Sequence, residues 1–359
     1  TRQAQHKPLS ELPVSLIAAA KHDLQVLQSL YRREGRQIGD WIQQITDLPT
    51  APVWYEPELG RVDAAWLHNS KDWTIDLPTL AAHYRQHGIG LLGEYRTLRW
   101  QQGQLVGVLH PDVIYPTDLV GYEWQRSQLL KNTEFLLAGY PAQNVLLYGS
   151  RGSGKSSLVK SLVSAFGDRG LRLIEVAKPD LKDLPTIIEL LRDAPQKIIL
   201  FVDDLSFEED GDDYRALKAV LEGSVVAKAP NVVVYATSNR RHLVREFLSD
   251  RPSPSQSDEV HAWDTVQEKL SFSDRFGLTL TFEPADQTTY LAIVHALADQ
   301  AHITLDSQTL DHYALQWATR YNGRSGRTAR QFIDFLRADL AINGAQSDVQ
   351  NVANHTKLG

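Results

Sequence analysis

Residues 149–156 read Gly-Ser-Arg-Gly-Ser-Gly-Lys-Ser, which is a complete phosphate-binding loop. The apolar run 144–148 before it and the run 157–163 after it predict the strand and the helix between which such a loop lies. Glycines let backbone N–H groups curl around an anion, and the helix N-terminus adds a partial positive charge. The stretch therefore predicts a nucleotide site in an α/β domain, rather than a glycine-rich turn followed by a chance Lys-Ser pair.

The chemistry of this Walker A loop gives roles to individual side chains. Lys155 is expected to reach the β- and γ-phosphates, and the hydroxyl of Ser156 is expected to ligate Mg²⁺. The residues expected to bind the nucleotide here are Gly149, Ser150, Arg151, Gly152, Ser153, Gly154, Lys155, Ser156 and Ser157.

A second predicted strand ends in two acidic residues. Residues 197–204 read Lys-Ile-Ile-Leu-Phe-Val-Asp-Asp, a continuous apolar run typical of a strand that is buried on both faces. Asp203 stands where a Walker B carboxylate would hold Mg²⁺, and Asp204 where an acid could polarise the attacking water. Alone, the run is equally compatible with a strand before a polar turn, and the upstream loop favours the Walker B interpretation.

Composition limits the classes of protein to consider. The 359 residues are 42% hydrophobic and 23% charged, which is typical of a globular chain of two or three domains. No apolar stretch approaches the roughly 20 residues of a membrane helix, so we expect a cytoplasmic protein without a membrane partner. The absence of cysteine excludes disulfides, catalytic thiols and zinc fingers. A net charge of −7 argues against coating of nucleic acid through the overall field.

The hydrophobic pattern changes along the chain. Helical spacing over residues 9–41, broken near Gly35, and over residues 77–87 predicts helices, and residues 98–108 predict two short strands around a Gln-Gly turn. Strands and helices alternate from Asp118 onward, which predicts a parallel sheet with crossover helices.

One further polar residue is expected at the site. A strand predicted at 171–176 precedes the Walker B strand, and another predicted at 231–239 follows it and ends at Asn239. In such a sheet Asn239 would lie beside the loop strand and could orient water against the γ-phosphate. A lone Asn at a strand end is otherwise a common turn former.

These segments in series resemble the AAA+ ATPases. The resemblance identifies Asn239 as sensor 1, Arg275 within Ser-Asp-Arg-Phe-Gly at 273–277 as an arginine finger, and Gly-Arg-Thr-Ala-Arg at 326–330 as sensor 2 at the start of a lid helix. The chain resembles most closely a bacterial AAA+ family catalogued as a domain of unknown function, over about residues 118–340. The signatures of that family correspond to residues 132–133, 203–208, 236–243, 270–280 and 325–332.

The resemblance implies an α/β P-loop NTPase fold of the AAA+ type. Its parallel sheet would be sandwiched by helices and accompanied by a small C-terminal helical lid and an N-terminal α+β domain. The implied parts are an N-terminal domain at 1–116, the ATPase core at 117–284, the lid at 285–345 and a tail at 346–359.

The resemblance also implies ligands and partners. Gly121 resembles the stretch that lines an adenine pocket, which favours ATP, and no Asn-Lys-x-Asp guanine-reading motif occurs. Arg275 would act on the ATP of a neighbouring subunit, an effect worth about 10³- to 10⁵-fold in rate, unless it is a surface arginine before a Phe-Gly turn. Arg327 would fold over the phosphates from the lid, with Arg330 as the alternative. The implied partners are ATP with Mg²⁺, further copies in a ring or partial ring, and an unidentified protein or nucleic-acid client.

Two features depart from most AAA+ motors. Asp204 is one methylene shorter than the usual glutamate, so hydrolysis could be slow or Glu208 could assist, although replication initiators and helicase loaders also use Asp-Asp. Residues 177–181 contain no aromatic-hydrophobic-glycine pore loop, so processive unfolding of polypeptide is not expected.

Three classes of function are compatible with these motifs. The favoured class is an oligomeric ATPase that remodels or loads a macromolecular partner. The second is a nucleotide-dependent switch or scaffold, including a DNA-associated one, with little turnover of its own. The third is a P-loop kinase for a small molecule, which would gain nothing from Asn239, Arg275 and Arg327 in series.

Overall fold

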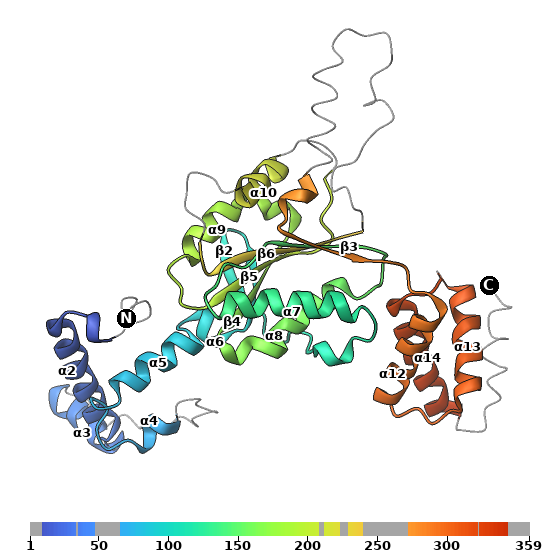
Figure 1. The fold of residues 1–359 in the computed structure, drawn as a ribbon. Coiled ribbons are helices and arrows are strands. Elements are labelled where there is room, and N and C mark those ends of the chain that lie inside the picture. Colours follow the sequence, from blue (N-terminus) through green and yellow to red (C-terminus); the bar gives the residue numbers. More distant parts are fainter. Residues whose placement is uncertain are drawn as a thin grey trace, which may run out of the picture. The chain divides into compact units, whose positions relative to one another are not determined.

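The computed structural model describes residues 9–33, 35–46, 65–207, 212–222, 229–239, 272–321 and 323–343 (Figure 1). The chain divides into two compact units, of which the first comprises Thr1–Ile89 with Asp193–Pro195 and the second Gly90–Arg192 with Gln196–Gly359. No helix within the described ranges is both long enough and apolar enough to span a membrane.

The described part of the first unit is helical. Its elements are η1 (Leu9–Glu11), α2 (Val14–Tyr31), α3 (Gly35–Ile45), α4 (Ala65–Asn69) and α5 (Leu77–His87). The helices predicted from the apolar spacing are confirmed, including the interruption near Gly35 and the bounds 77–87. The apolar faces of α2 and α5 line a cavity of about 190 Å³.

A seven-stranded sheet, ordered β2-β1-β4-β5-β6-β3-β7, forms the centre of the second unit. Its strands are β1 (Thr97–Gln101), β2 (Gln104–Gly107), β3 (Val145–Gly149), β4 (Leu171–Val176), β5 (Lys197–Val202), β6 (Val232–Ser238) and β7 (Leu278–Phe282). Neighbouring strands are parallel except in the β1–β2 hairpin, which is antiparallel. The strands predicted at 98–108 are this hairpin. Because β1 pairs with β4, the hairpin belongs to the second unit, and the boundary expected near residue 116 falls inside that unit.

Helices cover both faces of the sheet, as Figure 1 shows. On one face lie α7 (Glu123–Leu137) and α8 (Lys155–Phe166), and on the other lie α9 (Leu184–Leu191) and α10 (Asp212–Glu222). Side chains of α7 and α8 share one buried apolar cluster with β3, β4, β5 and β6. The strands of this cluster are covered by helices on both sides, which is why their sequences are continuously apolar. Short turns complete the unit at α6 (Leu91–Glu94), η2 (Pro116–Asp118), η3 (Gly167–Arg169), η4 (Lys178–Asp183) and η6 (Phe272–Arg275).

Three C-terminal helices form a bundle with its own core. They are α12 (Gln287–Gln300), α13 (Ser307–Arg320) and α14 (Gly326–Asn343), and they bury Tyr290, Leu310 and Phe332 together. Carboxylates cap two of them, because Asp286 accepts from the backbone N–H of Thr289 and Asp306 from that of Thr309. The predicted helix-covered parallel sheet with a small C-terminal helical domain is confirmed. The N-terminal α+β domain of that prediction is not found, because the described part of the first unit is helical and the β1–β2 hairpin belongs to the second unit. The tail expected at 346–359 lies outside the described residues.

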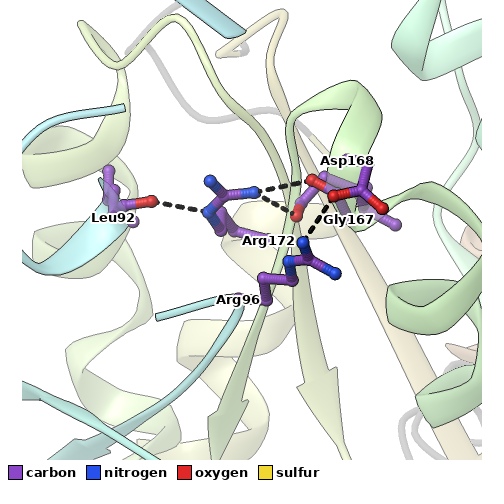
Figure 2. Close-up of polar contacts among 6 residues, drawn as sticks. Leu92, Arg96, Gly167, Asp168 and Arg172 are labelled. Carbon is purple, nitrogen blue, oxygen red and sulfur yellow. Dashed lines mark hydrogen bonds and ion pairs between the residues drawn. The ribbon is translucent and has the colours of Figure 1, made fainter. Parts of the chain in front are cut away.

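A buried arginine fastens the segment before β1 to the sheet. Arg172 of β4 donates from Nε to the carbonyl of Leu92 at 2.6 Å and from Nη1 to the carbonyls of Gly167 at 3.1 Å and Leu171 at 2.8 Å (Figure 2). Burial lowers the pKa of Arg172 to about 10. Arg96 and Asp168 form an ion pair beside it. These bonds satisfy a buried charge, and they tie α6 and the turn η3 to one strand.

A second polar network fixes the start of β3. The hydroxyl of Tyr235 lies 3.0 Å from Asn132 Nδ2 and 3.0 Å from Thr133 Oγ1, all within the core. Asn132 also bonds the backbone of Gln143 through both its amide nitrogen and its amide oxygen, at 3.0 Å each. The Asn-Thr signature at 132–133 therefore joins α7 to β6 and to the residue that leads into the loop strand.

Candidate functional site

A cavity of about 1150 Å³ opens in the second unit where the parallel strands end. The carboxyl edge of an open parallel sheet is where ligands of α/β proteins usually bind. Its walls come from the phosphate-binding loop, the ends of β5 and β6, residues 112–122 and the helices α12 and α14. Of the residues predicted from the sequence, those that line it are Gly121, Arg151, Gly152, Ser153, Gly154, Lys155, Ser156, Ser157, Asp203, Asp204, Asn239, Arg327 and Arg330.

The loop begins where β3 meets β7. The backbone N–H of Ser150 donates to the carbonyl oxygen of Phe282 at 2.8 Å, and Gly149 has φ +131°. A Cβ at position 149 would lie 2.0 Å from that same oxygen, so only glycine allows this approach. Gly149 and Ser150 thus form the base of the loop beneath the cavity, where their carbonyls accept hydrogen bonds from Lys155.

Lys155 begins α8 and is only 6% exposed. Its Nζ donates to the carbonyl of Ser150 at 2.7 Å and of Gly149 at 3.1 Å, and it lies 3.4 Å from Asn239 Oδ1. Burial lowers the pKa of this ammonium, whereas the nearby charges of Asp203 and Asp204 raise it. Within the described part of the chain the direct hydrogen-bond partners of this cation are neutral oxygens, so it is suited to bind an anion that enters the cavity.

The two predicted magnesium ligands lie side by side. Ser156 Oγ donates to Asp203 Oδ1 at 2.6 Å, which brings a hydroxyl and a carboxylate from α8 and β5 together at the cavity wall. Oxygen donors of this kind suit Mg²⁺, which proteins usually bind through one or two carboxylates together with substrate phosphates. The residues present therefore fit this metal.

Asp204 is held in an unusual conformation. Its φ of +50° lies in the left-handed region, and its backbone N–H donates to Thr237 Oγ1 at 3.0 Å. Asn239 Nδ2 donates to Asp204 Oδ1 at 2.6 Å. The parallel pairing of β3 with β6 confirms that the strand before Asn239 lies next to the loop strand. Glu208, considered as an assisting acid, lies outside the described residues.

The lid contributes positive charge to the same cavity. The backbone N–H of Arg327 donates to the carbonyl of Gly152 at 3.2 Å, which joins the start of α14 to the loop. Both Arg327 and Arg330 line the cavity, and the charge of Arg327 acts to lower the pKa of Lys155. Cationic side chains from α8 and from α14 therefore line the same cavity.

Another part of the cavity wall is apolar. It includes Val113, Ile114 and Leu119 from the segment after β2, and Ile293 and Leu297 from α12. Gly121 lies in this segment with φ +83°. The stretch predicted to line an adenine pocket therefore contributes to the apolar part of the cavity wall.

Tyr122, which follows that glycine, donates from its hydroxyl to the carbonyl of Glu283 at 2.5 Å. This bond attaches the lining segment to the connection between β7 and the lid.

Arg275 lies elsewhere in the unit. It ends η6 just before β7, does not line the cavity, and forms an ion pair with Glu222 at the end of α10. Its side chain is 20% exposed. The structure thus brings together the predicted site residues of the loop, the sheet and the lid, but not this one.

Sequence reasoning missed Thr237, which contacts both acids of the Walker B pair. A signal was present, because residues two apart on a strand point to the same face and Thr237 stands two residues before Asn239. It also missed Val113, Ile114, Ile293 and Leu297, whose apolar side chains carry no motif.

The sequence profile of a family described as "Protein of unknown function (DUF815)" matches residues 93–340. The chain belongs to this family. The DUF815 match begins close to the start of the second unit at Gly90 and includes the β1–β2 hairpin, so the family domain extends further toward the N-terminus than the resemblance over 118–340 implied. A comparison with curated proteins found no match.

Similar folds occur among solved structures. One is the RuvB Holliday junction branch migration motor of Thermotoga maritima, at 15% identity and a TM-score of 0.44, with 62% of this chain and 64% of that chain covered. Another is the AAA domain of FIGL-1 in complex with ADP, at 15% identity and a TM-score of 0.45, with 67% of this chain and 79% of that chain covered. The chain spans less than two thirds of the first structure, and these likenesses concern the fold alone.

Proposed function

We propose that this DUF815 protein binds and hydrolyses ATP and acts as an oligomeric ATPase that remodels or loads a macromolecular partner. The observation that supports this most strongly is the composition of one cavity. Lys155, the acid pair Asp203 and Asp204, Asn239 and the lid arginines all line it. A site for phosphoryl transfer needs such cations for the phosphates together with an acid for the nucleophile.

Each group has a specific task in this proposal. Lys155, Arg327 and Arg330 bind phosphate oxygens, and the phosphates replace the carbonyls of Gly149 and Ser150 as partners of the lysine. Ser156 and Asp203 would hold Mg²⁺, which when bound neutralises charge on the β- and γ-phosphates. The apolar surface beside Gly121 receives the adenine ring.

Asp204 accepts the proton of the attacking water in this proposal. The hydrogen bond of 2.6 Å from Asn239 Nδ2 keeps one of its oxygens oriented. A carboxylate held in this way is available as a general base without reorganisation at the moment of reaction.

Self-association into a ring or partial ring is supported by the position of Arg275. The residue lies outside the cavity of its own chain and on a short helix directly before β7, so it is mounted on the edge of the sheet. In an assembly it would reach the γ-phosphate of a neighbouring chain. Its intrachain partner Glu222 then holds it until that neighbour is present.

A nucleotide-dependent switch is the second candidate. It is favoured by Asp204, whose carboxylate is one methylene shorter than that of glutamate and is already bonded to Asn239. Such a protein would change its affinity for a protein or DNA client with the bound nucleotide, and turnover would be incidental.

The deciding experiment measures turnover per chain and mass in solution over a range of protein concentrations, with and without Mg-ATP. The proposal expects assembly in ATP and a rate per chain that rises with assembly. Asp204→Asn should bind ATP and assemble but not hydrolyse. Tight ATP binding with a negligible rate at every concentration, alone and with DNA added, would favour the switch.

A further inference from the structure

Thr237 is buried directly beneath the two acids of the cavity. It lies on β6, two residues before Asn239, and is 2% exposed. Its hydroxyl donates to Asp203 Oδ1 and accepts the backbone N–H of Asp204 at 3.0 Å. The hydroxyl of Thr237 therefore donates one hydrogen bond and accepts another, to two neighbouring acids that have different tasks in the proposed function.

The bond to Asp203 restricts the metal-binding carboxylate. Asp203 Oδ1 accepts from Ser156 Oγ at 2.6 Å as well as from Thr237. If the serine hydroxyl were to bind Mg²⁺, it would no longer donate to Asp203 in the same way, whereas the buried Thr237 hydroxyl could keep its hydrogen bond. A carboxylate fixed through one oxygen presents its second oxygen in one direction.

The bond to Asp204 supports a strained backbone. A φ of +50° is unfavourable for a residue that carries a Cβ. Thr237 contacts both sides of this turn, because its hydroxyl accepts the N–H of Asp204 and its carbonyl accepts the N–H of Leu205 at 2.7 Å. This left-handed turn directs the short side chain of Asp204 to Asn239. Strain that neighbouring groups hold in place is characteristic of functional sites.

We infer that Thr237 is a positioning residue for ATP hydrolysis: it orients the Asp203 carboxylate for the metal and holds the left-handed turn that directs Asp204 to Asn239. This inference rests on the function proposed above. Thr237 borders the same cavity, and in this inference it acts through its hydrogen bonds to the two acids.

Thr237→Val tests this role because valine has nearly the same shape and lacks the hydroxyl. Loss of a hydrogen bond to a charged group lowers the turnover number by roughly 10- to 100-fold. The KM for Mg-ATP rises by no more than the roughly 10-fold loss of Mg²⁺-dependent affinity, because the loop cation and the apolar surface are intact. The Mg²⁺ concentration for half-maximal rate rises. Thr237→Ser keeps the hydroxyl and restores most of the rate and of the Mg²⁺ response.

The matched control is Thr133→Val, which makes the same change at a buried hydroxyl that bonds Leu129 and Tyr235 instead of the acids. Thr133 Oγ1 bonds the carbonyl of Leu129 at 2.8 Å and lies 3.0 Å from the hydroxyl of Tyr235. It should lower the melting temperature as Thr237→Val does, and leave the turnover number and the Mg²⁺ response of the folded protein unchanged.

ATP binding measured with Mg²⁺ and with EDTA tests the proposed function and the role of Thr237 separately. In Thr237→Val, affinity in EDTA should match wild type and the gain in affinity on adding Mg²⁺ should shrink by roughly 10-fold. A wild-type protein that binds no ATP overturns the proposed function and this role together. A wild-type protein that binds ATP, with a Thr237→Val variant equal to it in rate and in Mg²⁺ response, overturns only the role of Thr237. Failure of Thr237→Ser to restore activity also overturns it.

Discussion

Replacing Gly149 with alanine tests the contact on which the base of the phosphate-binding loop depends. An added Cβ would lie 2.0 Å from the carbonyl oxygen of Phe282 and 2.7 Å from its carbonyl carbon. Both atoms belong to the backbone of β7, so no side-chain rotation can relieve the overlap. The two strands must separate at Gly149, where their pairing ends.

The expected loss of stability has two parts. A residue with a Cβ in a positive-φ conformation costs about 1–2 kcal/mol, and backbone displacement around an overpacked atom costs about 1–3 kcal/mol. Together they lower the free energy of unfolding by about 2–5 kcal/mol. At roughly 2–4 °C per kcal/mol for a domain of this size, the melting temperature should fall by about 4–20 °C. ATP affinity should fall too, because the bond from Ser150 to Phe282 shares this contact.

Gly139→Ala is the matched control. Gly139 has φ +82°, and no atom lies within 4 Å of the position that its Cβ would take. This variant therefore carries the conformational cost without the overlap, about 1–2 kcal/mol. Thermal and denaturant unfolding of both variants, together with ATP titration, measure the difference. If Gly149→Ala were as stable as Gly139→Ala, the close approach of β3 and β7 would be wrong.

Further predictions concern Tyr235, Lys155 and Arg275. Tyr235→Phe should lower the free energy of unfolding by about 1–3 kcal/mol, since Asn132 and Thr133 lose a buried partner. Burial raises the pKa of Tyr235 to about 12 from an ordinary 10.0, so the folded state holds this proton more tightly than the unfolded state does. The free energy of unfolding of the wild type should therefore fall as pH rises from 10 toward 12. Denaturant unfolding of Tyr235→Phe should show no such fall. Burial lowers the pKa of Lys155 below 10.5. The ATP affinity measured by calorimetry should therefore weaken as pH rises through that lowered pKa, because only the charged ammonium binds phosphate. An affinity that stays constant up to pH 10.5 would contradict this. Arg275→Ala should bind ATP nearly as wild type but lose most turnover, and mixing it with Lys155→Ala should restore part of the rate; a wild-type rate in assembled Arg275→Ala would exclude action on a neighbouring chain.

The sequence predicted the features that depend on local pattern. The loop needs glycines at fixed spacing, and a strand covered on both faces needs a continuous apolar run, so residues 149–156 and the strands β4, β5 and β6 could be located within a residue or two. The acids at the end of β5 followed from the same reasoning. Such features require no knowledge of which strands become neighbours.

Features that depend on distant pairing could not be predicted in this way. The hairpin at 97–107 joins the sheet because β1 pairs with β4, more than 70 residues away. The partner strand cannot be predicted from the sequence of the hairpin itself. Arg172 is buried because it meets the carbonyls of Leu92 and Gly167, which only the folded chain brings together. Thr237 acquires its two partners for the same reason. Each of these contacts joins segments that are far apart in sequence, so the sequence pattern does not show that their residues meet.

The most direct test of the account is calorimetric titration of the full chain with Mg-ATP. Wild type should bind one ATP per chain, and Lys155→Ala should bind at least roughly 10- to 100-fold more weakly, because the variant loses the buried cation of the loop. Lys160→Ala serves as the control, since that lysine lies on the same helix and does not line the cavity. Equal ATP affinity in wild type and Lys155→Ala, or no binding by wild type, would contradict the assignment of this cavity as a nucleotide site.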